Sequence, residues 1–261
     1  MRALPYDALA TIYDCWIQGD PARKACHDFY VRWATSQAGG VVEIGVGTGE
    51  IAIRIAHGGC NVVGIDVSEP MLRLCSTKVI REGVAHRVAL CRMNAMQLGL
   101  CNVERIILPF RTVGHFTERE QRLELFKQIR GSLRPGGLFV FDHYVLDREW
   151  AAEIAGKQTL MFESTAEDER LRILDSYEFD FGRGIMDCSV QIESSRHSNK
   201  TIREVNFEFA WVEPVEIRRQ VLAAGFEVVE VYGNFDRAEF ASTSEQQIWV
   251  LRRPEQARSR I

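Results

Sequence analysis

The sequence lacks both an excess of basic residues and a long uninterrupted apolar run. Its formal net charge at pH 7 is −4, so it offers no positive field to a phosphate backbone, and we expect no nucleic-acid partner. No segment approaches the roughly 20 apolar residues of a membrane span, and the N-terminus has no long apolar stretch typical of a signal peptide. We therefore expect a cytoplasmic protein with no membrane partner.

The cysteines do not form a recognisable pattern either. All seven lie outside any C-x-x-C pair, and their number is odd, so neither a disulfide framework nor a zinc site is indicated. Buried free thiols in a reducing compartment are the simpler interpretation. We expect no metal ion.

The most informative stretch of the chain is a strand that runs into a glycine-rich turn. Residues 41–44 are typical of a buried strand, and the turn that follows has glycines at positions 45, 47 and 49. Glycine tolerates φ > 0 and has no side chain, so this turn lets backbone N–H groups approach a ligand. Apolar spacing then predicts a helix over about 49–57, and a second strand over 62–65 ends at Asp66, which completes a βαβ unit.

The same alternation continues to about residue 144 and is preceded by two helices. Apolar residues make up 46% of the chain, enough for a large core. Short apolar runs predict parallel strands. They cover residues 88–91, 103–108 and 138–141. Helical spacing predicts helices over 8–16, 23–34 and 118–133, and another that Ser68 caps and that runs through residues 71–80.

After residue 144 the pattern changes to alternating apolar and polar residues, as in antiparallel strands. These strands are predicted over 171–181, 185–195 and 201–212, followed by a helix over 215–224 and strands over 226–232 and 247–251. We therefore predict an α/β protein: a Rossmann-like, doubly wound sheet of seven strands with an antiparallel β insertion after strand five.

The spacing of the glycines separates two classes of cofactor. A nicotinamide fingerprint is G-x-G-x-x-G, whereas this turn has G-x-G-x-G. In residues 43–49, 64–68 and 133–137, the sequence resembles the class I S-adenosylmethionine-dependent methyltransferases. The N-terminal Tyr-Asp pairs at 6–7 and 13–14 and residues 229–236 resemble the subgroup that acts on small-molecule amines and hydroxyls, such as amino-sugar and glycine N-methyltransferases.

This resemblance implies a residue-by-residue assignment of the cofactor site. The three glycines would pack against the methionine part of S-adenosylmethionine, Glu43 would lie beneath its ammonium group, and Asp66 would accept hydrogen bonds from the ribose. Asn94 takes the place of the acid that binds the adenine amino group in many relatives, and an amide oxygen can also accept that bond. The expected cofactor contacts are Glu43, Gly45, Gly47, Gly49, Asp66, Val67, Met71, Asn94, Ala95 and Leu108.

The methyl acceptor should lie at the carboxyl ends of strands four and five. Two histidines there, His115 and His143, are candidate general bases, although either could instead hydrogen-bond the surrounding loop. The resemblance also places Tyr13 beside the methyl-transfer site, because the N-terminal segment of that subgroup folds over the cofactor. Among the residues that could line the acceptor pocket are Phe162, Tyr177, Arg203 and Trp211.

Taken together, these patterns divide the chain into four parts. Residues 1–36 are expected to cap the cofactor site, 37–144 to form the cofactor-binding core, 145–213 to form an antiparallel cover or substrate lid, and 214–261 to complete the core sheet. The predicted activity is methyl transfer to a nitrogen or oxygen of a small molecule, in secondary metabolism. A cofactor-binding subunit without chemistry and a methyltransferase for proteins or nucleic acids are the alternatives, and a homo-oligomer is left open.

Overall fold

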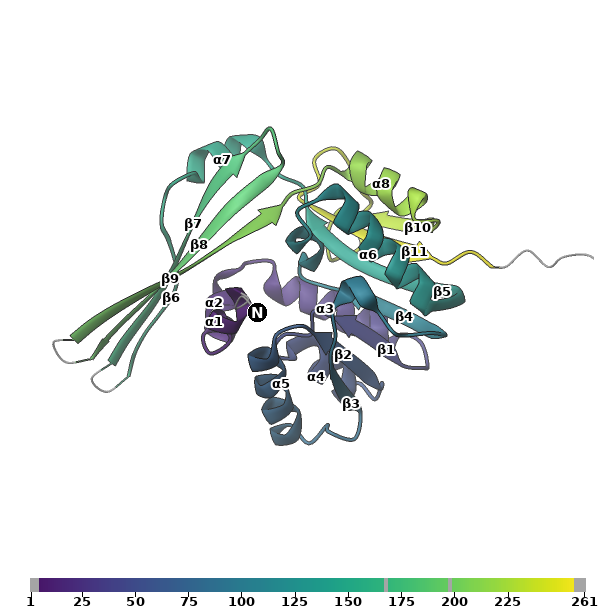
Figure 1. Ribbon diagram of the computed structural model, residues 1–261, viewed down its shortest axis with the longest axis horizontal. Coiled ribbons are helices and arrows are strands. Elements are labelled where there is room, and N and C mark those ends of the chain that lie inside the picture. The colour runs from purple at the N-terminus through teal and green to yellow at the C-terminus, as the bar shows by residue number, and fades with distance from the viewer. Residues whose placement is uncertain (1–4, 167–168, 197–198, 256–261) are drawn as a thin grey trace, which may run out of the picture.

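Two separate sheets organise the molecule (Figure 1). The computed structural model describes residues 5–166, 169–196 and 199–255, so the first four residues of the predicted cap lie outside the described part. The larger sheet has seven strands in the order β10-β11-β5-β4-β1-β2-β3. Its strands are β1 (Val41–Ile44), β2 (Val62–Asp66), β3 (Val88–Arg92), β4 (Val103–Leu108), β5 (Leu133–Tyr144), β10 (Glu227–Tyr232) and β11 (Gln246–Arg252).

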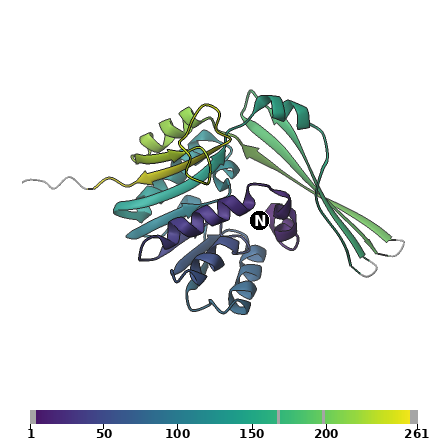
Figure 2. The same cartoon turned by 180° about the vertical axis from the view of Figure 1, so that it is seen from behind.

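Helices cover both faces of this sheet, as a doubly wound fold requires. One face packs against α3 (Arg23–Thr35), α4 (Glu50–His57) and α5 (Glu69–Arg81). Figure 2 shows α3 running along the strands from behind. The other face packs against α6 (Arg119–Ser132) and α8 (Pro214–Ala223). Strands β1 to β5 are parallel and β11 is antiparallel to both of its neighbours, so the predicted seven-stranded sheet is confirmed.

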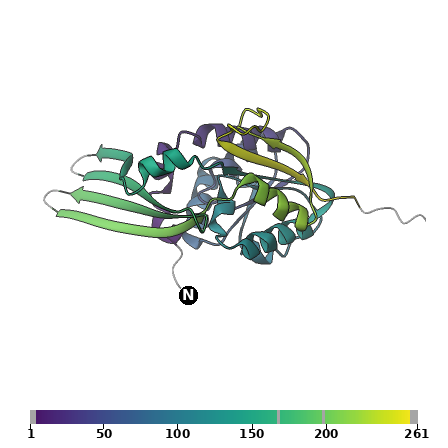
Figure 3. The ribbon, with the colours of Figure 1, turned by 90° about the horizontal axis from the view of Figure 1, so that it is seen from above.

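The smaller sheet is the predicted antiparallel insertion, and it lies between β5 and α8 in the sequence. Its strands are β6 (Thr159–Ala166), β7 (Glu169–Asp180), β8 (Ile185–Arg196) and β9 (Asn199–Ala210), and they are preceded by α7 (Arg148–Ile154). Figure 3 shows this sheet extending away from the larger one. Its inner face packs Ile173, Val190 and Val205 against Leu9 and Ile12, two buried residues of the N-terminal segment.

Three local predictions were wrong. The helix expected over 8–16 is two short helices, α1 (Pro5–Leu9) and α2 (Tyr13–Trp16), joined by a turn and followed by the 3-10 helix η1 (Ile17–Gly19). Strand five begins at residue 133, because Leu133 pairs with Val103 of β4 and Gly136 and Gly137 pair through their backbones with Arg253. Strand β6 and helix α7 were not predicted.

Candidate functional site

The glycine turn between β1 and α4 has the backbone conformation that its sequence predicts. Gly45, Gly47 and Gly49 have φ values of 74°, 53° and 88°, and Gly49 is the N-cap of α4. These values lie in the left-handed region, where a Cβ atom is strained. A Cβ on Gly49 would also collide with the Cys75 thiol, so this turn tolerates little besides glycine.

The carboxylate of Asp66 faces this turn from the end of β2. Its Oδ2 accepts a hydrogen bond from the Gly47 N–H at 2.9 Å, and its Oδ1 accepts one from the Ser68 N–H at 2.8 Å. Burial raises the pKa of Asp66, while these backbone hydrogen bonds oppose that rise. Each oxygen keeps a second lone pair, so the same carboxylate can also accept hydrogen bonds from ligand hydroxyls.

Ser68 has the capping role that the sequence predicted. Its side chain accepts a hydrogen bond from the Met71 N–H at 3.3 Å and so caps α5. Its hydroxyl also donates to Asp7 of α1 at 2.7 Å, which ties the N-terminal segment to the end of β2.

A second buried carboxylate, that of Glu43, lies in the middle of the large sheet. Only 2% of Glu43 is exposed, and its Oε2 has no hydrogen-bond partner among the described residues. Burial, and then the nearby Asp66, raise the pKa of Glu43. A buried acid with an unsatisfied oxygen fits a ligand that brings its own hydrogen-bond donors or positive charge.

The other expected cofactor contacts are spread over several elements. Met71 is buried in α5, whereas Val67 is 41% exposed before that helix. Asn94 caps the 3-10 helix η2 (Ala95–Gln97), and its Oδ1 accepts the Met96 N–H at 2.9 Å. Leu108 is completely buried in the core at the end of β4. The amide oxygen of Asn94 therefore already has one partner, which was not expected.

The N-terminal helices lie directly over the glycine turn. A Cβ built on Gly47 would lie 4.0 Å from the Tyr13 ring, and the Thr48 hydroxyl donates to Asp14 at 2.5 Å. Lys78 of α5 forms an ion pair with the same Asp14. The segment that contains Tyr13 is thus fixed on the turn by polar contacts.

An aromatic cluster connects these helices with the large and small sheets. Tyr6 donates to or accepts from His115 Nε2 at 3.0 Å, and the two rings are 5.0 Å apart. Tyr6 also lies 6.0 Å from Tyr13 and 5.6 Å from Phe207 of β9, measured between ring centroids. Trp16 lies 6.3 Å from Phe207. The structure therefore brings Tyr13 and His115 into one cluster, beside the glycine turn.

His115 belongs to the 3-10 helix η3 (Thr112–His115), which follows β4. Burial lowers the pKa of His115 to about 4, so its ring is neutral at pH 7 and can accept a proton. Burial also raises the pKa values of Tyr6 and Tyr13, which keeps both hydroxyls protonated. Of the side chains of Tyr6, Tyr13 and His115, that of His115 is the most basic.

His143 lies in different surroundings, deep in β5. Its Nε2 accepts the Val212 N–H at 3.1 Å, and the side chain is completely buried. Burial lowers its pKa to about 3. This hydrogen bond joins β5 to the chain that returns from the small sheet, and we infer a structural role for His143.

Sequence reasoning missed the residue that shapes the loop before His115. Asp142 accepts the Tyr30 hydroxyl at 2.6 Å and the backbone N–H groups of Phe110 and Arg111 at 2.8 and 3.0 Å. Phe110 and Arg111 have positive φ values of 57° and 61°, which this buried carboxylate stabilises. The only signal in the sequence was the acid at the end of a predicted parallel strand.

The small sheet presents aromatic and polar groups near this cluster. Its strands pair Tyr177, Cys188 and Phe207 in one row, because β7, β8 and β9 are in register there. Of the expected pocket residues, Phe162 packs with the apolar cluster of the inner face, whereas Arg203 is exposed. Trp211 is buried against Phe181 and Arg148, in contacts outside the aromatic cluster.

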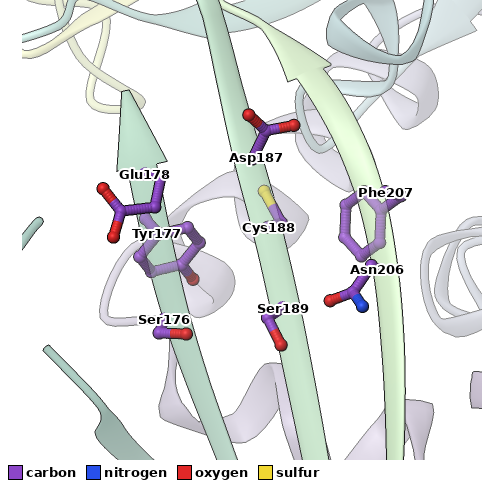
Figure 4. A pocket seen from close by; sticks show the side chains of 8 residues that line it. All are labelled: Ser176, Tyr177, Glu178, Asp187, Cys188, Ser189, Asn206 and Phe207. Carbon is purple, nitrogen blue, oxygen red and sulfur yellow. The ribbon is translucent and has the colours of Figure 1, made fainter. Parts of the chain in front are cut away.

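A hollow of about 240 Å³ is lined by residues of β7, β8 and β9 (Figure 4). It is lined by Ser176, Tyr177, Glu178, Asp187, Cys188, Ser189, Asn206 and Phe207. A second hollow, of about 340 Å³, is lined mainly by charged residues of α3, α4 and α5. Among the described residues no group of His, Cys, Asp or Glu could hold a metal ion, and no helix is long and apolar enough to cross a membrane.

Comparisons with known proteins agree with this geometry. The family model described as "Methyltransferase domain" matches residues 41–137, which contain the glycine turn and Asp66. The putative methyltransferase YqeM of Bacillus subtilis is 25% identical over 142 residues, covering 52% of this chain and 54% of that protein. A putative methyltransferase of Geobacillus sp. is 23% identical over 223 residues, covering 82% and 84%. The chain thus matches about half the length of the first relative and most of the second.

Solved structures with the same fold span almost the whole chain. The CcbJ methyltransferase from Streptomyces caelestis has a TM-score of 0.78 at 24% identity, covering 96% of this chain and 98% of that one. The sugar N-methyltransferase KedS8 from Streptoalloteichus sp. has a TM-score of 0.76 at 14% identity, covering 98% and 96%. CalS10, an amino pentose methyltransferase whose structure contains SAM, has a TM-score of 0.66 at 16% identity, covering 93% and 96%. These likenesses extend to the N-terminal helices and the small sheet.

Proposed function

We propose that the chain transfers a methyl group from S-adenosylmethionine to a nitrogen or oxygen of a small molecule, in secondary metabolism, and the match of residues 41–137 to the methyltransferase-domain family supports this proposal. In this proposal residues 1–36 cap the cofactor, 37–144 bind it, 145–213 cover the acceptor and 214–261 complete the sheet. The named sugar methyltransferases among the structural relatives support a small acceptor.

The observation that carries the proposal is the pair of acids around the glycine turn. The unsatisfied Glu43 Oε2 fits the ammonium group of the methionine part, which would supply the missing hydrogen-bond donor. Asp66 is partly accessible at the end of β2, with lone pairs free for the two ribose hydroxyls. The three glycines of the turn have no side chains, which leaves room for the part of the cofactor that joins its ammonium group to its ribose.

The residues beyond the turn are suited to align the reacting groups. When bound, the cofactor supplies a methyl group that its sulfonium sulfur activates for in-line displacement. Tyr13 lies over Gly47 and would orient the acceptor toward that methyl group. His115 is the candidate general base because its ring is neutral at pH 7 and hydrogen-bonds Tyr6, although burial, by lowering its pKa to about 4, makes it a weak one.

Transfer of a labelled methyl group by the purified protein alone tests this proposal. We expect S-adenosylmethionine to bind, and its labelled methyl group to appear in products when small amines and alcohols are supplied. Failure of a correctly folded protein to bind the cofactor would contradict the proposal. Binding without turnover on any acceptor would instead favour a cofactor-binding subunit without chemistry.

A further inference from the structure

A buried acid on the small sheet has one oxygen that accepts no well-formed hydrogen bond from the described residues. Asp175 of β7 is 2% exposed, and its Oδ2 accepts the Tyr177 hydroxyl at 2.6 Å. Its Oδ1 accepts no hydrogen bond of normal geometry within the described residues, and none of them forms an ion pair with it there. Such an oxygen calls for an explanation, because buried polar atoms are nearly always satisfied.

The described side chains that act most strongly on Asp175 are aromatic or acidic. Asp175 pairs with Val190 of β8, and Tyr177 pairs with Cys188, so these side chains share the inner face of the sheet. The indole of Trp16 approaches the carboxyl and favours its charged form. The titratable groups that act on the site are Tyr177, Cys188 and the more distant Asp20, and none of them brings a positive charge.

Asp175 is connected to the glycine turn through two aromatic residues. Tyr13 lies over Gly47, and Tyr13 and Trp16 are 6.1 Å apart between ring centroids. Trp16 is in turn next to Asp175 and 6.3 Å from Phe207. Trp16 therefore lies between the residues of the proposed methyl-transfer site and this carboxylate.

We propose that Asp175 binds a positively charged amine of the methyl acceptor, which selects amine-bearing acceptors with an apolar body. This inference rests on the proposed function and names its substrate class. An ammonium group satisfies the lone pairs of Oδ1 and neutralises the buried charge, and the rings of Trp16 and Tyr177 can add cation–π attraction. Asp175 is a binding residue in this account and takes no part in the bonds that are made or broken.

The unpartnered acid also has a consequence for stability. Burial raises the pKa of Asp175, so the folded protein must accommodate an unfavourable charge once the carboxyl ionises. The resulting destabilisation is absent below about pH 4, the pKa of an unfolded aspartate, and increases as the pH rises above it. Asp175→Asn removes this charge but keeps an oxygen for Tyr177, so the variant should be at least as thermally stable as the wild type at pH 7.5.

The binding test uses phenethylamine and 2-phenylethanol, which differ only in the charged group. Both are titrated into the wild type, Asp175→Asn and the matched control Asp187→Asn, each saturated with S-adenosylhomocysteine. Asp187 is exposed on the opposite face of the same sheet. We expect phenethylamine to bind the wild type and the control at least tenfold more tightly than Asp175→Asn, and the alcohol to bind all three alike.

Three results would overturn the inference: no binding of the amine to the wild type, equal binding of amine and alcohol, or an amine affinity that Asp175→Asn leaves unchanged. A lower melting temperature of Asp175→Asn at pH 7.5 would also overturn it, because it would make the carboxylate a structural group. If S-adenosylhomocysteine itself does not bind the wild type, the proposed function fails as well. If S-adenosylhomocysteine binds but phenethylamine shows none of the expected differences in affinity, only the present inference fails.

Discussion

At the scale of single residues, the backbone of the site followed from the sequence, but the partners of its side chains did not. The positive φ values of Gly45, Gly47 and Gly49 and the Ser68 cap depend on local chemistry, and they were predicted. The hydrogen bond from His115 to Tyr6 spans 109 residues, and the one from Val212 to His143 spans 69. No local pattern encodes such pairs, so two histidines with different surroundings looked alike in the sequence.

Asp66 is the residue whose loss should affect cofactor binding most directly. Asp66→Ala removes the proposed acceptor for two ribose hydroxyls and also frees the Gly47 N–H, which should weaken S-adenosylmethionine binding by about 2 kcal/mol. Isothermal titration calorimetry measures the change, with the exposed Asp187→Ala as control. Unchanged affinity in Asp66→Ala would show that the ribose is bound elsewhere.

The role of His143 can be tested through the pH dependence of stability. His143→Leu leaves the buried Val212 N–H without a partner and should cost about 1–3 kcal/mol at pH 7. The folded-state pKa of His143, about 3, lies below its unfolded value, so the wild type loses stability as the pH falls below about 6.5. The difference between wild type and variant should therefore shrink on acidification, by up to about 1.4 kcal/mol per pH unit.

Chemical denaturation at several pH values measures this difference. The folded fraction of His143→Leu should retain methyl transfer within a few-fold of wild type. A loss of 100-fold or more in kcat with unchanged stability would contradict the structural role and make His143 the base.

At the scale of elements, the parallel strands were predicted because each is a short apolar run, whereas the ends of the insertion were missed. Strand β6 pairs only with β7, and a register shift between Leu160 and Phe162 breaks its alternation of apolar and polar residues. Strand β5 starts early because its first residue pairs with β4 and its glycines pair with the chain beyond β11. Both features depend on strands distant in the sequence.

The contact between η3 and β9 determines how the small sheet is docked beside the site. A Cβ on Gly114 would overlap the Phe209 ring, which in turn lies 4.9 Å from the His115 ring. Gly114→Ala should therefore displace β9, destabilise the protein by about 1–3 kcal/mol and lower methyl transfer, with cofactor affinity preserved.

Gly131→Ala is the matched control for this substitution. Gly131 lies in α6, and a Cβ there has no neighbour within 4 Å, so alanine should slightly stabilise the helix. Equal effects of the two substitutions on turnover would contradict the proposed docking contact.

At the scale of the whole molecule, the order of α and β segments predicted the doubly wound sheet, but not where the insertion lies relative to it. The position of the small sheet depends on Leu9 and Ile12 from the N-terminus packing against its inner face. In the sequence, only a family resemblance indicated that the N-terminal segment and the insertion lie over the cofactor. Their apolar contact is the physical reason that the N-terminal segment and the small sheet lie together.

Because the proposed cofactor site is bordered by the N-terminal helices and the core, ligand binding should stabilise the whole fold. S-adenosylhomocysteine at 100 times its Kd should raise the free energy of unfolding by about 2.7 kcal/mol in one cooperative transition. Calorimetry with increasing ligand measures this. A second transition that does not respond to ligand would show that the small sheet unfolds independently.

A crystal structure of the protein with S-adenosylhomocysteine is the most direct test of the central claim. The account predicts the ribose hydroxyls on Asp66, the ammonium group near Glu43, and the sulfur facing Tyr13 across the glycine turn. A ligand bound away from this turn, or a turn that stays empty at saturating ligand, would contradict it.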